Sequence, residues 1–562
     1  MQIKVPTRRT VTDLVCRGIP LYIFILSALL VYRFAIIDMD AHHTGLMYKT
    51  ALDVAAGKVM FRETFTQYGA LTAYVQALFI RIFGERITSI HLATALCYAA
   101  DYTLLYLVVK KLTGTPTALA ATGITLFLAP YFFWEFHPWS SVFALLFMLL
   151  SLYSLLWAIE HAGKVGLLLS ALSGLCAALT FWARQPVGLV TILAGLLCIG
   201  GAIFLARQKK PIRVRFFALF LLFVAGVAAG ILLFLLPILA NGAMGDFVQQ
   251  SLSGMLNLAT DRAEGELYGG YGFVGLLLYD LFLAPFRHLW TPAVFNVFWA
   301  FLPASALALA VWEIVRLLLA SRKKNPDFTP TPKELSLLFY CIFAVAEWHQ
   351  YYPVDCLRHW YWGAFLCVPA MILLAGRLLS LWMNCRPFAF LREGRRPLIA
   401  LVLVCLLCFG SNVGYHAVRG GIRLVETTKW GRYENAYYHH LDGLYISGEM
   451  ADYYDRLFEA MHTLQTAFPD KNVVNTTENG IYAVFGENFC PMFTNCGDFF
   501  YPDYPTWQAD YIRAQRPIVI GAEAPQQDYV LYRAMDGYDG DPTAEFHRMP
   551  ANIYIPAELT LP

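Results

Sequence analysis

The strongest constraint on this chain is a series of apolar runs, each near the length at which an α-helix crosses a bilayer, about 20 residues. Only 15% of the 562 residues are charged, against about 25% in an average soluble domain. These features predict an all-α polytopic membrane domain. By the length rule there are about eleven transmembrane helices. They are expected near residues 19–37, 90–109, 116–133, 141–159, 165–183, 187–206, 216–240, 292–319, 335–352, 360–382 and 397–416.

The positions of Lys and Arg predict the orientation, because cytoplasmic connections carry an excess of both. Besides the N-terminus, the basic clusters lie at 110–111, 164, 207–215, 322–324 and 386–396. The opposite side then receives 38–89, 131–140, 184–186, 241–291, 353–359 and the chain after 417. We therefore expect a multi-pass protein of the cytoplasmic (inner) membrane, with a cytoplasmic N-terminus and an extracytoplasmic C-terminal domain. No basic stripe suited to nucleic acid is present.

Two segments need separate interpretation. The run at 19–37 follows several basic residues, as a signal peptide would, but it is long and no small-residue cleavage pattern precedes Asp38. It is therefore expected to be an uncleaved first span. The apolar run at 273–286 is too short for a full crossing, and a crossing there would place the basic cluster at 322–324 outside. It is expected to be a re-entrant or interfacial helix.

The chain divides into two expected domains. Residues 1–418 form the multi-span membrane domain, and residues 419–562 form a small soluble extracytoplasmic domain. The second part is rich in Tyr, Asp, Asn and Pro, and we expect a mixed α+β fold of roughly 140 residues. Its pattern predicts a helix over 453–468 and short strands over 472–475 and 517–521.

Cysteines lie mostly in the apolar runs, where a free thiol behaves as a small hydrophobic group. Cys490 and Cys496 differ because they lie close together in the polar C-terminal domain. They either form a disulfide, which a non-cytoplasmic compartment permits, or remain a reduced and buried pair.

The first outer loop, 38–89, begins with four ionisable side chains, Asp38, Asp40, His42 and His43. An amphipathic helix is expected from Thr44 to Ala56, with Leu46, Leu52 and Ala56 on one face and Lys49 and Asp53 on the other. Gly57 has the position of a glycine that ends a helix.

These carboxylates have two readings. Asp38 or Asp40 could accept a proton from an attacking hydroxyl as a general base, or ligate a divalent cation with His42 or His43. Alternatively, they cap the helix that follows. Adjacent histidines point about 100° apart on a helix, so the two rings are not expected to share one metal.

Further ionisable side chains occur on the same predicted side. Glu63, beside Arg62, is either a second carboxylate of the cleft or part of a solvated ion pair. Arg184 either holds a phosphate or extends toward lipid headgroups. The aromatic residues around 131–139 are expected to form a belt at the membrane interface. Such a belt does not explain the ionisable residues on the same side, which are Glu135, His137, His349, Arg358 and His359.

The first loop resembles that of the C-type (GT-C) glycosyltransferases, such as the protein O-mannosyltransferases and the aminoarabinose transferases of lipid A. The resemblance is carried by an Asp after the first span, the amphipathic helix, Phe-Arg-Glu at 61–63 and Gln-Tyr-Gly-Ala at 67–70. Segments 184–188 and 352–359 match more loosely. It implies transfer of a sugar from a polyprenyl-phosphate donor, with inversion, to an extracytoplasmic glycan, lipid or protein acceptor.

The resemblance also suggests residue roles. It assigns the family's loop carboxylate to Asp40, with Asp38 as its neighbour, and the second acidic position to Glu63. Phosphate binding would fall to Arg184 and Arg358, supported by His359, and the cleft would be lined by His42, His43, Glu135, His137 and His349. A cofactor is not certain, but a divalent metal ion remains open, since His42-His43 departs from the family's usual residues.

A transporter or flippase for lipid-linked glycans is the alternative function. Such proteins commonly contain internal repeats and charged residues within their spans. Here no repeat is detected, and the spans contain few acids, namely Asp101, Asp280 and Glu313. The absence of a phosphate-binding glycine motif after a strand agrees with a donor other than a soluble nucleotide sugar.

Overall fold

The computed structural model describes most of the chain. The described residues are 8–66, 68–132, 136–207, 209–253, 272–283, 293–322, 328–351, 357–384, 410, 414–494, 503–535 and 551–559. Glu135 and Cys496 lie outside these ranges, so neither the role expected for Glu135 nor the state of the Cys490–Cys496 pair is addressed by the structure.

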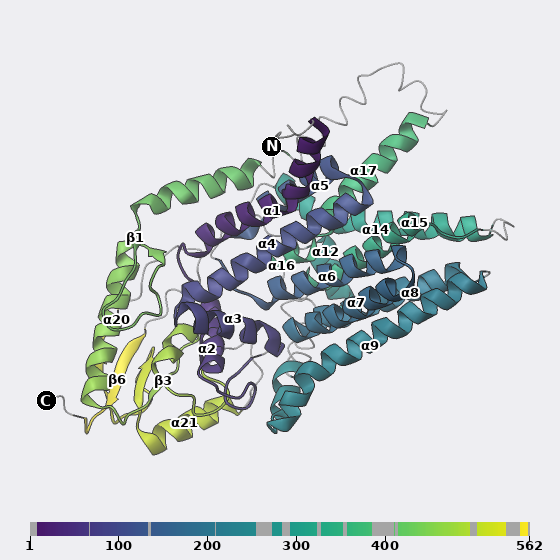
Figure 1. Ribbon diagram of the computed structural model, residues 1–562. Helices are drawn as coiled ribbons and strands as arrows, with labels where there is room; N and C mark the ends of the chain where they lie inside the picture. The colour runs from purple at the N-terminus through teal and green to yellow at the C-terminus, as the bar shows by residue number, and fades with distance from the viewer. Residues whose placement is uncertain are drawn as a thin grey trace, which may run out of the picture.

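Seven described helices are long and apolar enough to cross a membrane, and a pair bent by 58° makes a possible eighth. The seven are α1 (Arg8–Ala35), α4 (Ile87–Leu112), α6 (Ser140–Glu160), α7 (Gly163–Ala183), α8 (Gln185–Leu205), α9 (Lys210–Ala240) and α14 (Ala293–Arg322). The bent pair consists of α16 (Leu357–Gly363) and α17 (Cys367–Asn384). These helices run side by side as one bundle (Figure 1). The predicted fold class, membrane helices followed by a small mixed region, is confirmed.

Other predicted spans differ in detail. The run at 116–133 contains the 13-residue helix α5 (Thr115–Phe127), and the run at 335–352 contains the 15-residue helix α15 (Pro332–Ala346). Most of 397–416 lies outside the described residues. The run at 273–286 forms α12 (Gly272–Phe282), whose 11 residues extend about 16 Å. This is about half the hydrocarbon thickness of a bilayer, in agreement with a segment too short to cross.

Close packing of α7 against α9 depends on glycine. A Cβ on Gly226 of α9 would lie 2.0 Å from the carbonyl oxygen of Ala171, and one on Gly174 of α7 would lie 1.9 Å from that of Phe223. In a bilayer the lipid tails are as apolar as the helices, so helices associate mainly through close packing. Small residues allow this packing because they let two helix backbones approach each other closely. Trp182 adds an indole hydrogen bond to the Gly230 carbonyl oxygen, at 3.1 Å.

The loop after α1 folds into two helices, α2 (His43–Ala55) and α3 (Ala70–Phe83). The predicted helix end is confirmed, since Gly57 follows it with φ +96°. The polar face of α2 is buried. Lys49 and Asp53 are each 3% exposed and form an ion pair of 3.0 Å beneath the C-terminal region. Short turns occur nearby as η1 (Pro130–Phe132), α10 (Met244–Phe247), η2 (Val248–Ser253) and η4 (Glu347–Tyr351).

The C-terminal region, residues 427–559 where described, contains a four-stranded sheet in the order β3-β4-β6-β5. Strands β3 and β4 are parallel, and the remaining pairs are antiparallel. The predicted helix at 453–468 is found but begins earlier, because the Ser447 hydroxyl accepts the Met450 N–H at 3.2 Å and caps it. The elements are η6 (Thr427–Lys429), β1 (Gly431–Arg432), β2 (Tyr445–Ile446), α20 (Gly448–Ala467), β3 (Val473–Asn475), η7 (Gly480–Phe485), α21 (Tyr504–Gln515), β4 (Ile518–Gly521), β5 (Tyr529–Arg533) and β6 (Asn552–Pro556).

This region packs against one end of the helix bundle, beside α2 (Figure 1). Backbone pairing joins it to the end of α1, where the Asp38 N–H donates to the Tyr445 carbonyl oxygen at 2.9 Å and the Tyr445 N–H donates to that of Ile36 at 2.7 Å. A second junction joins the Ile87 N–H at the start of α4 to the His440 carbonyl oxygen, at 2.9 Å. The first loop is therefore enclosed between the bundle and the C-terminal region.

We expect Gly226→Ala to lower the thermal stability of the purified protein in detergent. The new methyl group forces α7 and α9 apart, and overpacking of this kind costs about 1–3 kcal/mol. Gly200→Ala on α8 is the matched control, since a Cβ there meets no atom within 4 Å. Equal unfolding temperatures for the two variants would contradict this account of the helix contact.

Candidate active site

Asp40 is the centre of the candidate site. It lies between α1 and α2 and is only 6% exposed. Its Oδ1 accepts the backbone N–H groups of His42 and His43, both at 2.9 Å. One carboxylate oxygen therefore caps the start of α2, as the alternative reading of the sequence anticipated, and the other is left for side chains.

The second oxygen joins the first loop to one distant connection directly, and through His137 to another. Asp40 Oδ2 lies 2.6 Å from His43 Nδ1 and 2.9 Å from His137 Nε2. The Arg358 guanidinium in turn contacts His137 Nε2. Asp40, His137 and Arg358 thus form one contiguous cluster, although they come from the α1–α2 junction, the segment before α6 and the start of α16. We call these residues, with His43, the Asp40 cluster.

The Asp40 cluster holds a negative charge in a buried place. Burial alone raises the pKa of the Asp40 carboxyl, but the neighbouring His43 and His137 rings outweigh burial and hold that pKa well below its usual value. Burial, followed by the charge of Arg358, lowers the pKa of His137 to about 4. Near neutral pH the cluster therefore contains an ionised carboxylate, a neutral His137 and the cationic Arg358.

Arg184 provides a second buried cation. It lies at the junction of α7 and α8, where the following proline starts α8, and is 5% exposed. Its guanidinium bonds the Ser141 hydroxyl and lies 5.6 Å from the centre of the Tyr68 ring. Burial, and then the charge of Arg184, lowers the pKa of His349 in η4 to about 4.

Aromatic rings connect the two cations. Trp139 packs edge-on against His43, with ring centres 5.3 Å apart, and against Tyr68, at 5.2 Å. Tyr68 is the ring beneath Arg184. The expected interfacial belt is wrong for Tyr131, Phe136 and Trp139, which are all buried within the protein. The sequence alone did not identify Trp139, Tyr68 and Ser141 as neighbours of the site. A hydropathy pattern does not say which residues are close in space, so only the folded structure shows them.

The side chains of other predicted residues make contacts outside the Asp40 cluster. Asp38 adopts φ +63° and accepts the Met39 N–H at 2.8 Å, and His42 Nδ1 faces the Glu478 carbonyl oxygen at 2.5 Å. Glu63 is exposed and accepts the Val59 N–H at 2.7 Å within its own turn. His359 bonds the Gln350 carbonyl oxygen at 3.0 Å. None of these contacts is with Asp40, so the structure does not bring Glu63 into the Asp40 cluster as the sequence suggested.

The Asp40 cluster also has the donor set of a metal site. One ligand atom each from Asp40, His43 and His137 lies within 4.8 Å of the other two. Three N/O ligands with an open fourth position are typical of catalytic zinc. The donors therefore fit a divalent ion in number and spacing, but Arg358 lies against the same nitrogen of His137 and opposes a cation there.

This competition predicts opposite effects of two variants on Zn²⁺ binding. His43→Ala removes a ligand and should weaken binding at least about tenfold, or about 1.4 kcal/mol. Arg358→Ala removes a like charge and should strengthen it. Calorimetric titration of the purified protein checks both, with His439→Ala, an exposed histidine of the C-terminal region, as the control. Equal affinity in all three variants would rule out this site.

Comparison with known proteins supports the family resemblance. Residues 69–235 match the model of a family described as dolichyl-phosphate-mannose-protein mannosyltransferase. The resemblance to the C-type glycosyltransferases predicted from the sequence is thereby confirmed. The matched segment includes His137 and Arg184 and begins after Asp40.

Two solved structures are similar to the chain. ArnT from Cupriavidus metallidurans, bound to undecaprenyl phosphate, has 12% identity and a TM-score of 0.45, covering 97% of this chain and 99% of that one. The oligosaccharyltransferase AglB from Archaeoglobus fulgidus, in complex with an inhibitory peptide and a dolichol-phosphate, has 13% identity and a TM-score of 0.44, covering 72% of this chain. The chain spans 56% of the length of AglB. No curated protein sequence matches it.

Proposed function

We propose that this protein is a membrane glycosyltransferase that takes a sugar from a polyprenyl-phosphate donor and transfers it to a hydroxyl of a glycan, lipid or protein acceptor on the extracytoplasmic side. The observation that carries the proposal is the contact of Asp40 with His137 and of His137 with Arg358. It places an anion that can accept a proton next to a cation that can hold a phosphate, within one buried cluster.

The reaction follows from these charges. The acceptor attacks the anomeric carbon, its proton passes to Asp40, and the bond between that carbon and the phosphate oxygen breaks with its electron pair remaining on the phosphate. Arg358 stabilises the charge on the leaving phosphate, and Arg184 provides a further cation across the Tyr68 and Trp139 rings. Direct displacement inverts the anomeric carbon. No nucleotide pocket is required for such a donor.

A divalent ion bound by Asp40, His43 and His137 would supply positive charge to the phosphate or sugar. The proton-accepting and phosphate-binding roles proposed above belong to the protein's own residues. In this scheme Asp38, Glu63, His42 and His359 contribute by shaping the surrounding backbone and not by contacting the reacting atoms.

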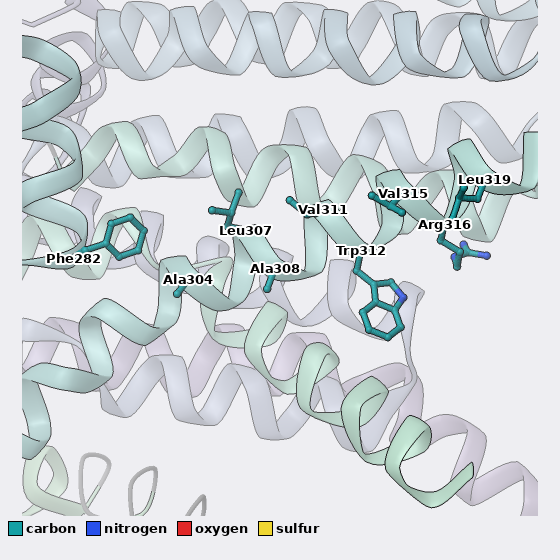
Figure 2. Close-up of a pocket in the computed structure, with 9 residues that line it drawn as sticks. All are labelled: Phe282, Ala304, Leu307, Ala308, Val311, Trp312, Val315, Arg316 and Leu319. Carbon is teal, nitrogen blue, oxygen red and sulfur yellow. The ribbon is translucent and has the colours of Figure 1, made fainter. Parts of the chain in front are cut away.

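An apolar groove offers a place for the hydrocarbon chain of the donor. It has a volume of about 820 Å³ and is lined along α14 by apolar side chains, with Phe282 of α12 at one end and Arg316 at the other (Figure 2). Because α12 also packs against η4, which carries His349 beside Arg184, the Phe282 end lies toward the candidate site. Arg316 is already bonded to Glu313 and Glu334, so we assign this groove to the chain of the lipid and not to its phosphate.

The transporter alternative is less well supported. Of the acids expected within spans, Glu313 is paired with Arg316 at 2.9 Å and Arg377 at 2.6 Å, which joins α14 to α17. These ion pairs stabilise the packing of α14 against α17, so the presence of Glu313 within a span is explained without a transported substrate. The orientation that we propose keeps the N-terminus cytoplasmic and the C-terminal region, with the Asp40 cluster, on the extracytoplasmic side.

Asp40→Asn should reduce sugar transfer from a polyprenyl-phosphate donor by about 10²–10⁴-fold, the usual contribution of a general base. The measurement is turnover of radiolabelled donor by the purified protein in lipid nanodiscs. Asp510→Asn, at an exposed position of α21, is the control for loss of a carboxylate. Wild-type turnover by Asp40→Asn would overturn the proposed role of Asp40.

Filling the groove tests where the lipid chain binds. Ala308→Trp should raise the KM for a long-chain polyprenyl donor at least about tenfold, since it removes apolar contact area, and should leave transfer from a short-chain donor analogue unchanged. Ala229→Trp, on the exposed face of α9, adds the same side chain at the lipid surface as a control. Equal effects on long and short donors would argue against this position of the chain.

A further inference from the structure

The C-terminal region contacts the backbone that carries Asp40. The Ile481 N–H at the start of η7 donates to the Ala41 carbonyl oxygen at 3.1 Å. The His42 ring, through Nδ1, bonds the Glu478 carbonyl oxygen at 2.5 Å. Ala41 and His42, the two residues that follow Asp40, are therefore fixed by one short segment, 478–481, that is more than 400 positions away in sequence.

Two glycines make this contact possible. A Cβ on Gly480 would lie 2.5 Å from the backbone nitrogen of Leu46, and a Cβ on Gly45 would lie 2.1 Å from that of Ile481. Real Cβ atoms do not approach other atoms so closely, so the first turn of α2 and the start of η7 touch backbone to backbone. Any side chain at either position displaces one segment from the other.

The segment that presents Gly480 is itself held rigidly. The Asn475 amide donates to the Asn479 carbonyl oxygen at 2.9 Å, the Thr477 N–H donates to Asn475 Oδ1 at 3.0 Å, and the Asn479 N–H donates to Thr477 Oγ1 at 3.1 Å. The Thr494 hydroxyl holds the Thr477 carbonyl oxygen at 2.9 Å. These bonds connect the turn to the end of β3 in the sheet.

A buried ion pair fixes the far end of α2 to the same region. Lys49 donates to the Gly486 carbonyl oxygen at 3.2 Å while paired with Asp53. The Asn488 amide bridges Asp53 Oδ2, at 2.8 Å, and the Glu63 carbonyl oxygen, at 3.0 Å. Both ends of α2 are therefore held by residues 478–488, whereas the second carboxylate oxygen of Asp40 is held by His43 of α2 and by His137 of the segment before α6.

We infer that residues 478–481 of the C-terminal region are positioning residues for Asp40, acting through His42 and the glycine contact between Gly45 and Gly480. This inference rests on the proposed function and adds a role for the C-terminal region, which completes the catalytic loop. His43 and His137 orient Asp40 Oδ2, and the C-terminal region fixes the main chain that aligns Oδ1. Both are needed because a carboxylate placed about 1 Å away loses much of its catalytic effect.

The first test is Gly480→Ala compared with Gly448→Ala, where a Cβ meets no atom within 4 Å. We expect Gly480→Ala to lower kcat at least tenfold and to change the KM for the lipid donor less than twofold, because the cations that hold the phosphate are untouched. Gly448→Ala should behave as wild type. Wild-type kcat in Gly480→Ala, or a KM that rises as much as kcat falls, would overturn the inference.

The second test uses rescue at His42. His42→Ala should lower kcat, and His42→Asn should restore most of it, because the Asn amide nitrogen occupies the position of Nδ1 and can donate to the Glu478 carbonyl oxygen. A role of His42 in holding substrate or general stability would not be rescued in this way. Equal kcat values for His42→Ala and His42→Asn would count against the positioning role.

A third readout is independent of catalysis. Hydrogen–deuterium exchange of the backbone amides of residues 41–46 should accelerate in Gly480→Ala and not in Gly448→Ala. If the wild-type protein transfers no sugar from any polyprenyl-phosphate donor, the proposed function fails, and the exchange measurement alone decides whether the C-terminal region holds this loop. Unchanged exchange in Gly480→Ala would refute that.

Discussion

An ionised carboxylate held away from water is the constraint on which this structure depends. Removing a carboxylate from water costs several kcal/mol unless other groups replace its hydration. At Asp40 the replacement consists of two backbone N–H groups on one oxygen and two imidazoles on the other, with a guanidinium behind one of them. Because these groups come from several connections, the carboxylate is stable only when the helices that carry them are correctly packed.

The same requirement appears at other buried charges. Asp53 accepts hydrogen bonds from Lys49, Thr64 and Asn488, and Glu313 is paired with two arginines. The first set joins the initial loop to the C-terminal region, and the second joins the helices near the groove. Each buried charge thus fixes the relative position of elements that apolar contacts alone would hold with less specificity, because a partner displaced by a few ångströms leaves a charge uncompensated.

The sequence predicted the helical membrane fold class, because long apolar runs have one stable outcome in a bilayer. It predicted about eleven spans, whereas seven or eight helices of the described residues are long and apolar enough to cross. It predicted α5 and α15 as longer than they are, since hydropathy does not distinguish a span from a shorter buried helix followed by irregular chain. Asp40, His137 and Arg358 were each identified as ionisable groups on one predicted side. Which of these side chains contact one another depends on how the segments between the helices pack together, and a single sequence does not show which of these segments meet.

The misplaced residues have equally physical reasons. The spacing in α2 predicted that Lys49 and Asp53 share one face, but it does not show that the C-terminal region covers them. His42 and His43 differ by about 100° in direction, so only one ring faces Asp40. Trp139 and Tyr68 carry no charge, and nothing in their spacing separates them from residues that merely face lipid.

The parallel pairing of β3 with β4, and the position of β6 between β4 and β5, have a consequence for biosynthesis. Asp40 leaves the ribosome early, yet the sheet that supports the turn at 478–481 is incomplete until the strand at 552–556 has been translated and has taken its place between β4 and β5. During most of its synthesis the chain therefore contains Asp40 without the region that holds the start of α2. If Asp40 acts as proposed, a truncated nascent chain would be inert toward lipid-linked sugars.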